Sequence, residues 1–260
     1  MSTLLEIRTN VQANLPSGYH SSGLTDSKID EFINTTQRWV CRGTIFMPNG
    51  QLVSHNFSWL KREIEGSTTD GQRRYALPDG TESGIWRFRC EQSCELIDSD
   101  GNRRPLKRRL KRDIENDRYY LDTTDTGEPK EYCIDDFDLW FYPLPDHSRN
   151  DNQAWTINLE YYGYLPDLSD DDDTNALTNG YPEVLEYGAT EMAFRYGMDE
   201  EQAEYWKVKK VEVFIEMLKV DQALDFSGLE DSIQPYLGQS LGYTQPGTTY
   251  PYYMNDTPYN

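Results

Sequence analysis

The sequence has few of the residues that most often carry chemistry. It holds only three histidines and four cysteines among 260 residues. Cys90 and Cys94 have three residues between them rather than the two that redox and zinc motifs use. We therefore expect reduced thiols, no structural zinc site and no bound cofactor.

Signatures of catalysis are scarce as well. The sequence has no Gly-x-x-x-x-Gly-Lys phosphate loop and no Gly-x-Gly-x-x-Gly fingerprint. Its one Gly-x-Ser-x-Gly match, "GQSLG" at residues 238–242, lies in a C-terminal stretch without sustained periodicity rather than between a strand and a helix. Its many carboxylates will place some pair at glycosidase spacing by chance, so they indicate nothing alone. We expect a protein that is not an enzyme.

Long apolar runs are also lacking, and this argues against a membrane protein. No stretch reaches the length of a bilayer span. The N-terminal "MSTLLEIRTNVQANL" has no basic start followed by an apolar core, so no secretory signal is expected.

Acidic residues dominate the charge. Asp and Glu number 45 against 25 Lys and Arg, for a formal net charge of −20. Such a chain repels nucleic acid at long range, so we expect no strong wrapping of DNA, while DNA can pass nearby without sticking. Aromatic residues reach 13%, including nineteen tyrosines, which favours packed and interacting surfaces over a solvating tail.

The run "LPDLSDDDDTNAL" concentrates five aspartates within seven residues, from Asp167 to Asp173. A calcium loop needs glycine at its sixth position and glutamate at its twelfth. A frame that starts at Asp167 puts Asp172 and Thr178 there, and a frame from Asp170 ends on Tyr181. We expect a solvated connector that ends near a helix N-terminus, with a calcium-dependent structural protein as an alternative.

Helices are predicted at both ends of the chain. The first covers residues 4–15, and the second begins at Thr25 or Asp26, either of which can cap it, and ends at Gly43. A third helix has Pro182 near its start and Gly197 as its C-terminal cap.

A fourth helix follows that tight turn. Asp199 is its predicted N-cap, with Gln202 at capping-box spacing. Its predicted apolar face consists of Ala203, Val208, Val211, Ile215 and Leu218, with Phe214 beside them. We expect the third and fourth helices to pack as an antiparallel pair.

Between the helices, residues 44–164 read as short antiparallel strands separated by turns. In "WTINLEYYGY" the side chains of Trp155, Ile157, Leu159 and Tyr161 share one face, as in a half-buried strand. The pair Asp135 and Asp136 is interpreted as a turn. The predicted fold class is α+β: a helical bundle of residues 1–43 and 165–224, an inserted β-rich domain of residues 44–164, and an extended tail of residues 225–260.

One short basic helix is predicted inside the β-rich region, in "RRPLKRRLKRDIENDRYY", where Leu106, Leu110 and Ile114 recur at helical spacing and Pro105 suits the first turn. Its basic residues are candidates for a subunit or tail interface, with nucleic-acid contact or a solvated face as alternatives: Arg103, Arg104, Lys107, Arg108, Arg109, Lys111 and Arg112.

Three stretches in their order resemble the head-to-tail adaptor family of tailed phages, the connector proteins that sit under the portal. They are "KIDEFINTTQRWV", "TGEPKEYCIDDFDLWFYPLPD" and "YYGYLPDLSDDDDTNAL…YPEVLEYGATEMAF". Together they cover most of residues 25–222. The basic helix and the first half of the β-rich region match only loosely, and the tail matches by position and character.

The resemblance implies a structural virion protein without catalysis. It implies a ring of identical subunits, a dodecamer, that docks beneath the portal protein in the phage neck, extends the DNA channel and presents a surface for the tail or nozzle protein. Assembly would take place in the bacterial cytoplasm, and DNA would pass without specific binding. A tail-associated enzyme or carbohydrate-binding module is the alternative, suggested by the aromatic β-rich middle.

Within that resemblance the aromatic tail is the expected portal anchor, which becomes ordered only on docking. The alternative is a free, unattached C-terminal end. The candidate docking residues are Phe226, Tyr236, Tyr243, Tyr250, Tyr252, Tyr253 and Tyr259.

Overall fold

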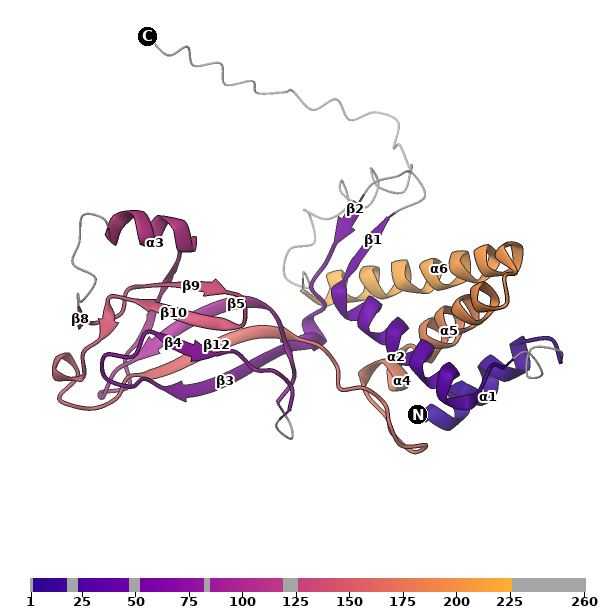
Figure 1. Ribbon diagram of the computed structural model, residues 1–260, viewed down its shortest axis with the longest axis horizontal. Helices are drawn as coiled ribbons and strands as arrows, with labels where there is room; N and C mark the ends of the chain where they lie inside the picture. The colour runs from indigo at the N-terminus through magenta and orange to yellow at the C-terminus, as the bar shows by residue number, and fades with distance from the viewer. Residues whose placement is uncertain (1, 18–22, 47–51, 82–84, 119–125, 226–260) are drawn as a thin grey trace, which may run out of the picture. The chain divides into compact units, whose positions relative to one another are not determined.

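The computed structural model of the chain describes residues 2–17, 23–46, 52–81, 85–118 and 126–225 (Figure 1). It is mixed helix and sheet, with helices at both ends of a long run of strands. The described residues up to Leu218 form one compact unit. The division into a helical bundle and an inserted β-rich domain stays a prediction.

The two N-terminal helices begin and end where their caps predict. Helix α1 spans Leu4–Asn14 and starts with a capping box between Thr3 and Glu6. Helix α2 spans Asp26–Arg42; the Thr25 side chain caps its start, and Gly43 ends it in the left-handed region at φ 63°. A side chain at Gly43 would also collide with the His55 carbonyl, 1.8 Å from the Cβ position. Both constraints require glycine there.

Three helices follow the strands: α4 (Ala176–Gly180), α5 (Pro182–Tyr196) and α6 (Glu200–Asp225). The predicted caps are confirmed: α5 has proline in its first turn and ends at Gly197, and the Asp199 carboxylate accepts from the Gln202 amide at 3.2 Å. The short helix α4 begins where the predicted connector ends, and Asn175 caps it. None of the helices in the described residues combines the length and apolar character needed to cross a bilayer.

Within the described residues the strands form two four-stranded sheets and two smaller pairs. One sheet has the order β4-β10-β9-β7, the other β3-β12-β5-β6; β1 pairs with β2, and β8 with β11. In chain order the strands are β1 (Thr44–Phe46), β2 (Leu52–Ser54), β3 (Lys61–Ser67), β4 (Arg74–Ala76), β5 (Phe88–Ile97), β6 (Arg103–Pro105), β7 (Lys107–Arg108), β8 (Thr126–Gly127), β9 (Glu131–Asp135), β10 (Asp138–Tyr142), β11 (Leu144–Pro145) and β12 (Thr156–Gly163).

The two large sheets share one apolar core. Strand β12 lies between β3 and β5, and its Ile157, Leu159 and Tyr161 are buried together with the preceding Trp155, as the alternation predicted. Leu139 and Phe141 of β10 add to the same core from the second sheet. The β9–β10 turn is confirmed, with Asp136 at φ 55°.

The predicted basic helix is wrong over its first half. Residues 103–105 pair with β5 and residues 107–108 pair with β9, and the helix α3 covers only Lys111–Arg118. The Leu106 amide donates to the Cys94 carbonyl at 2.9 Å, and the Lys107 amide to the Lys130 carbonyl at 3.0 Å. Pairing with strands on both sides therefore overrides the helical spacing of the leucines.

Candidate interaction surfaces

The basic segment, residues 103–112, is largely neutralised by acidic residues of the neighbouring strands. Arg108 contacts Glu91 at 2.5 Å, Arg109 contacts Glu131 at 3.0 Å, and Lys111 contacts Asp135 at 2.5 Å. Further pairs join Arg103 to Glu95 and Arg104 to both Asp98 and Glu128. These cations hold β6, β7 and α3 against β5 and β9.

Arg112 is the most outward cation of the segment for which an ion pair is described. Its side chain is 78% exposed, and among the side chains that the structure describes Asp113 is the one acidic partner within ion-pair range, at 3.5 Å. Among the paired cations of the segment it is therefore the one best placed to meet another molecule without first breaking a contact inside the sheet.

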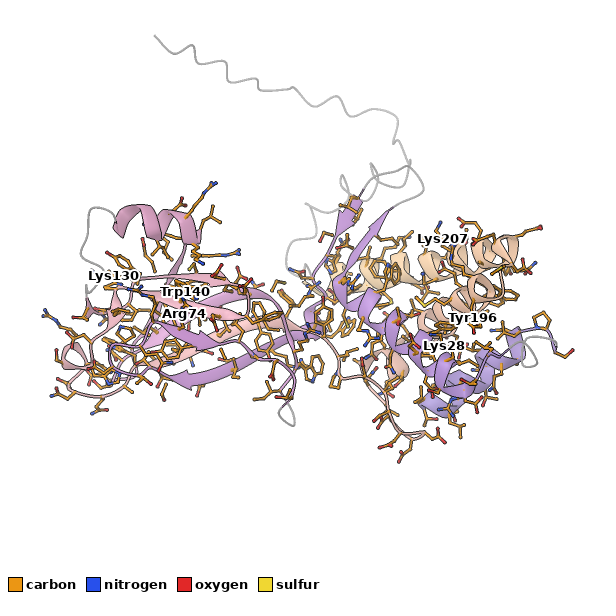
Figure 2. The ribbon with its side chains drawn as sticks, in the orientation of Figure 1. Lys28, Arg74, Lys130, Trp140, Tyr196 and Lys207 are labelled. Carbon is orange, nitrogen blue, oxygen red and sulfur yellow. The ribbon has the colours of Figure 1, made fainter. Side chains whose placement is uncertain are left out.

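Helix α3 packs on the sheet through Trp140. The Ile114 side chain is buried with Cys133 and Trp140. Arg74 lies 4.1 Å from the Trp140 ring (Figure 2). Lys111 lies 4.8 Å from the same ring, so two cations contact one indole. This aromatic contact fixes the start of α3.

The predicted portal-docking residues, from Phe226 to Tyr259, lie outside the described residues. Their role stays a prediction that rests on sequence.

Two arginines of the N-terminal helices hold the aspartate run. Arg8 contacts Asp171 at 2.9 Å, and Arg38 contacts Asp167 at 2.8 Å. The Asp173 carboxylate accepts hydrogen bonds from the backbone amides of Asp170 and Ser169, and these bonds lower its pKa. The run is therefore a charged connector between β12 and α4 that is tied to α1 and α2 as well.

Within the described ranges, no three or more His, Cys, Asp or Glu side chains gather closely enough to hold a metal ion.

Helix α6 buries a different face from the one predicted. Ala203, Phe214 and Leu218 are buried as expected, but Val208 is 51% exposed. Val211 and Ile215 are only half-buried. The buried side instead carries Lys210 and Met217. Apolar periodicity alone could not place a lysine in the core, because only its partner makes that burial tolerable.

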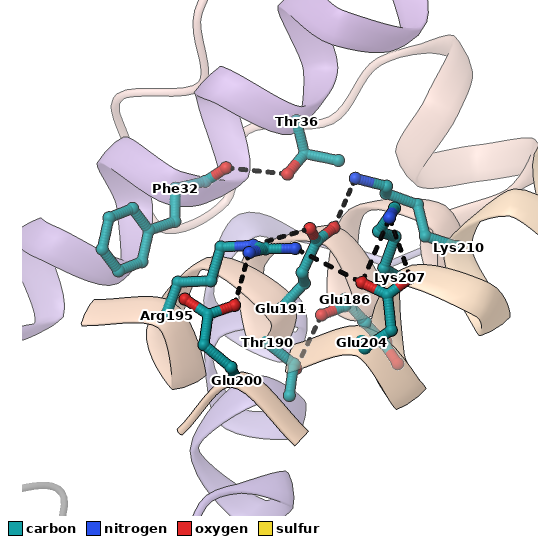
Figure 3. Close-up of polar contacts among 10 residues, drawn as sticks. All are labelled: Phe32, Thr36, Glu186, Thr190, Glu191, Arg195, Glu200, Glu204, Lys207 and Lys210. Carbon is teal, nitrogen blue, oxygen red and sulfur yellow. Dashed lines mark hydrogen bonds and ion pairs between the residues drawn. The ribbon is translucent and has the colours of Figure 1, made fainter. Parts of the chain in front are cut away.

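That partner is Glu191 of α5. Lys210 donates to it at 2.5 Å and also lies 4.4 Å from the Trp39 ring of α2. Arg195 donates to the other oxygen of Glu191 at 3.1 Å and reaches Glu200 of α6 at 2.7 Å (Figure 3). A charged network therefore links α5 to α6, with α2 beside it.

The opposite face of α6 leaves an apolar stripe outside the core. We call Tyr205, Val208, Val211 and Ile215 the α6 outer stripe; Tyr205 is 53% exposed. At 100° per residue these side chains lie on the side of the helix away from Lys210 and Met217. Half-exposed valine, isoleucine and tyrosine in a row are typical of a protein-contact surface.

A cavity of about 380 Å³ adjoins the stripe, between α1, α5 and α6. The centre of the Trp206 ring in its wall lies 5.5 Å from that of Tyr187, with the planes tilted by 42°, and 5.4 Å from that of Tyr205 in a T-shaped contact. Glu186 lies at its rim, where burial raises the pKa of its carboxyl. Sequence reasoning missed this aromatic cluster because its members come from two helices.

The α6 outer stripe and the aromatic cavity beside it are surfaces suited to contact with other proteins. The chain belongs to the SU10 adaptor protein family, whose model matches residues 2–225. This is a phage adaptor family, so the chain is a structural virion protein that contacts other virion components. A search of curated proteins gave no match.

Proposed function

We propose that the protein is a head-to-tail adaptor that forms a ring of identical subunits, a dodecamer, beneath the portal in the phage neck. The ring extends the DNA channel and offers the attachment surface for the tail. The observation that carries the proposal is the family match over residues 2–225. The protein acts through assembly rather than catalysis.

The α6 outer stripe supports a subunit contact. A closed ring repeats one heterologous interface, in which a patch on each subunit meets a different patch on the next. The stripe supplies apolar area, and the cavity beside it supplies Tyr205 and Trp206, residue types enriched where interface energy concentrates.

The charge supports passage of DNA. The net charge of −20 repels phosphates. Most cations of the basic segment already form ion pairs within the protein, among them those with Glu91, Glu131 and Asp135. A channel built from such subunits lets DNA slide without specific binding.

The tail residues are the proposed portal anchor. Residues 232–255 contain no charged side chain in an otherwise acidic chain and include five tyrosines. Tyrosine gives large contact area at low entropy cost, so such a segment suits docking onto a partner surface.

Imaging of mixtures tests the proposal. The full chain is mixed with purified portal rings and viewed by negative-stain electron microscopy. We expect a second ring stacked coaxially on the portal. A Val208→Glu variant, altered on the α6 outer stripe, should give incomplete rings, and an Arg112→Lys variant should stack normally. Portal rings that stay bare at saturating concentrations of folded protein would refute the adaptor role.

A further inference from the structure

The two large sheets are joined on one side and open on the other. Strands β6 and β7 follow one another directly, so the chain crosses from one sheet to the next through Leu106. At the far ends of the two sheets stand β3 and β4, each with one strand neighbour in the described residues. The curled sheet therefore has a seam between β3 and β4.

The backbone of β3 offers unpaired groups along this seam. The Thr68 amide donates to the Trp155 carbonyl at 2.8 Å, and Ile64 stands opposite Leu159 in the register. Because hydrogen-bonded pairs alternate in an antiparallel ladder, Ile64 and Gly66 turn their N–H and C=O groups toward β12. Glu63 and Glu65 turn theirs toward the open edge.

An apolar groove of about 400 Å³ runs along the same seam. Its lining includes core side chains from both sheets: Ile64, Tyr75, Leu77, Leu139, Ile157 and Leu159. Gly66 borders it, and a Cβ added there would meet no atom within 4 Å. Leu77, Leu139, Ile157 and Leu159 are at most 6% exposed, and Ile64 and Tyr75 are half-buried. A further strand would therefore cover chiefly Ile64 and Tyr75, at the mouth of the groove.

The rim of the groove determines what can fill it. Glu65 and Asp79 line it and are exposed, so an acidic segment is repelled while an uncharged or basic one is accepted. A second β3 would fit poorly. If two β3 strands pair antiparallel with Ile64 opposite Ile64, Glu63 of each copy lies opposite Glu65 of the other. Like charges directly opposite one another destabilise a strand pair.

We propose that the β3–β4 seam is a strand-docking site for a partner protein. The occupant is an extended segment without acidic residues that has apolar side chains at alternate positions. Its main chain pairs with the open edge of β3, and its apolar side chains fill the groove. The inference goes beyond the proposed function and stands without it, because it uses only the geometry of the sheets.

A peptide titration of the full chain tests the site. The probe is a fluorescein-labelled peptide in which Leu, Tyr and Leu alternate with Thr between two terminal lysines, followed by fluorescence anisotropy. We expect saturable binding. N-methylation of the Thr amides, which would face β3, should weaken binding by about tenfold or more, because it removes the main-chain donors and leaves the side chains unchanged. N-methylation of the Leu and Tyr amides should weaken it less.

Two glycine variants locate the binding. Gly66→Val puts a side chain into the groove and should weaken probe binding by about tenfold or more. Gly180→Val is the matched control, since a Cβ at Gly180 also meets no atom within 4 Å; it should leave binding unchanged. Circular dichroism and urea unfolding verify that both variants fold.

Four results would overturn the inference. The first is a lack of saturable binding of the probe. The second and third are that the Thr-N-methylated peptide binds as tightly as the unmethylated probe, or that Gly66→Val binds the probe as tightly as the unaltered chain. The fourth is self-association of the full chain that Gly66→Val abolishes, which would assign the groove to a second copy. None of these measurements uses the portal, so failure here is separate from failure of the adaptor role.

Discussion

Lys210 of α6 and Glu191 of α5 form an ion pair at 2.5 Å, and both residues are less than 10% exposed. The pair lies between helices that are adjacent in the chain, and Arg195 contacts the second oxygen of Glu191. It holds α6 to α5 only as long as both charges remain.

Removal of one member should therefore destabilise the protein more than removal of both. We expect Lys210→Met to lower the free energy of unfolding by about 3 kcal/mol, at the lower end of the range for one-sided removal because Arg195 still pairs with Glu191. The double variant Lys210→Met/Glu191→Leu should recover most of that loss. Urea unfolding measures both. Lys207→Met, which alters an exposed pair with Glu204, is the control and should change little. A double variant less stable than Lys210→Met would contradict this account.

Gly188 lets α5 approach α2. A Cβ at this position would lie 2.3 Å from the Thr36 methyl group and 2.6 Å from its hydroxyl. We expect Gly188→Ala to cost about 1–3 kcal/mol through overpacking, and Thr36→Ala to rescue part of the loss in the double variant. Gly180→Ala is the control, as its Cβ would be in open space. Thermal unfolding that shows equal loss for Gly188→Ala and Gly180→Ala would count against a close helix contact.

Charge reversal separates the two roles of the basic segment. Arg109→Glu places a like charge beside Glu131, so stability should fall by about 1 kcal/mol, and the swap Arg109→Glu/Glu131→Arg should restore it. Arg108 and Lys111 also form ion pairs with acidic residues of the sheet. Reversing their charge would therefore change both the stability of the fold and any contact with another molecule.

Arg112→Glu should leave stability unchanged, because that side chain is exposed. If the segment contacts a neighbouring subunit or the tail, Arg112→Glu should nonetheless reduce assembly in the negative-stain assay. Unimpaired assembly would remove that role.

Burial of two thiols should make stability fall at high pH. Desolvation raises the pKa of Cys41 to about 11 and the pKa of Cys94 to about 12. In the unfolded chain a thiol ionises near pH 8.5. The unfolded state therefore loses protons first, and stability is lost as pH rises from about 8.5 through the folded pKa values. Under reducing conditions, the urea midpoint at about pH 10 should be lower than the midpoint at about pH 8. This drop should be smaller in the Cys41→Ala variant. An equal drop in that variant would show that Cys41 does not contribute.

Truncation tests the tail. Removal of residues 226–260 takes away the uncharged tyrosine-rich segment and no part of the described elements. We expect unchanged unfolding of the remainder and loss of portal binding, measured by co-sedimentation with portal rings. A truncated chain that still sediments with the portal would place the docking surface elsewhere.

The sequence by itself determined the ends of the elements, because the signals act within a few residues. Thr25, Gly43 and Asp199 cap helices where their side chains or left-handed backbone require it. The alternation from Trp155 to Tyr161 determined which side of β12 is buried, since period two fixes the face of a strand without reference to its neighbours.

Only the tertiary structure decided which partners those elements found. Residues 103–108 became strands because β5 and β9 lie on either side of them. Lys210 entered the core because Glu191 meets it there, and Asp171 is held by an arginine that lies far away in the sequence. The seam between β3 and β4 has no signal in either strand. Such features depend on the energy of contacts between distant segments, which exist only once the chain has folded.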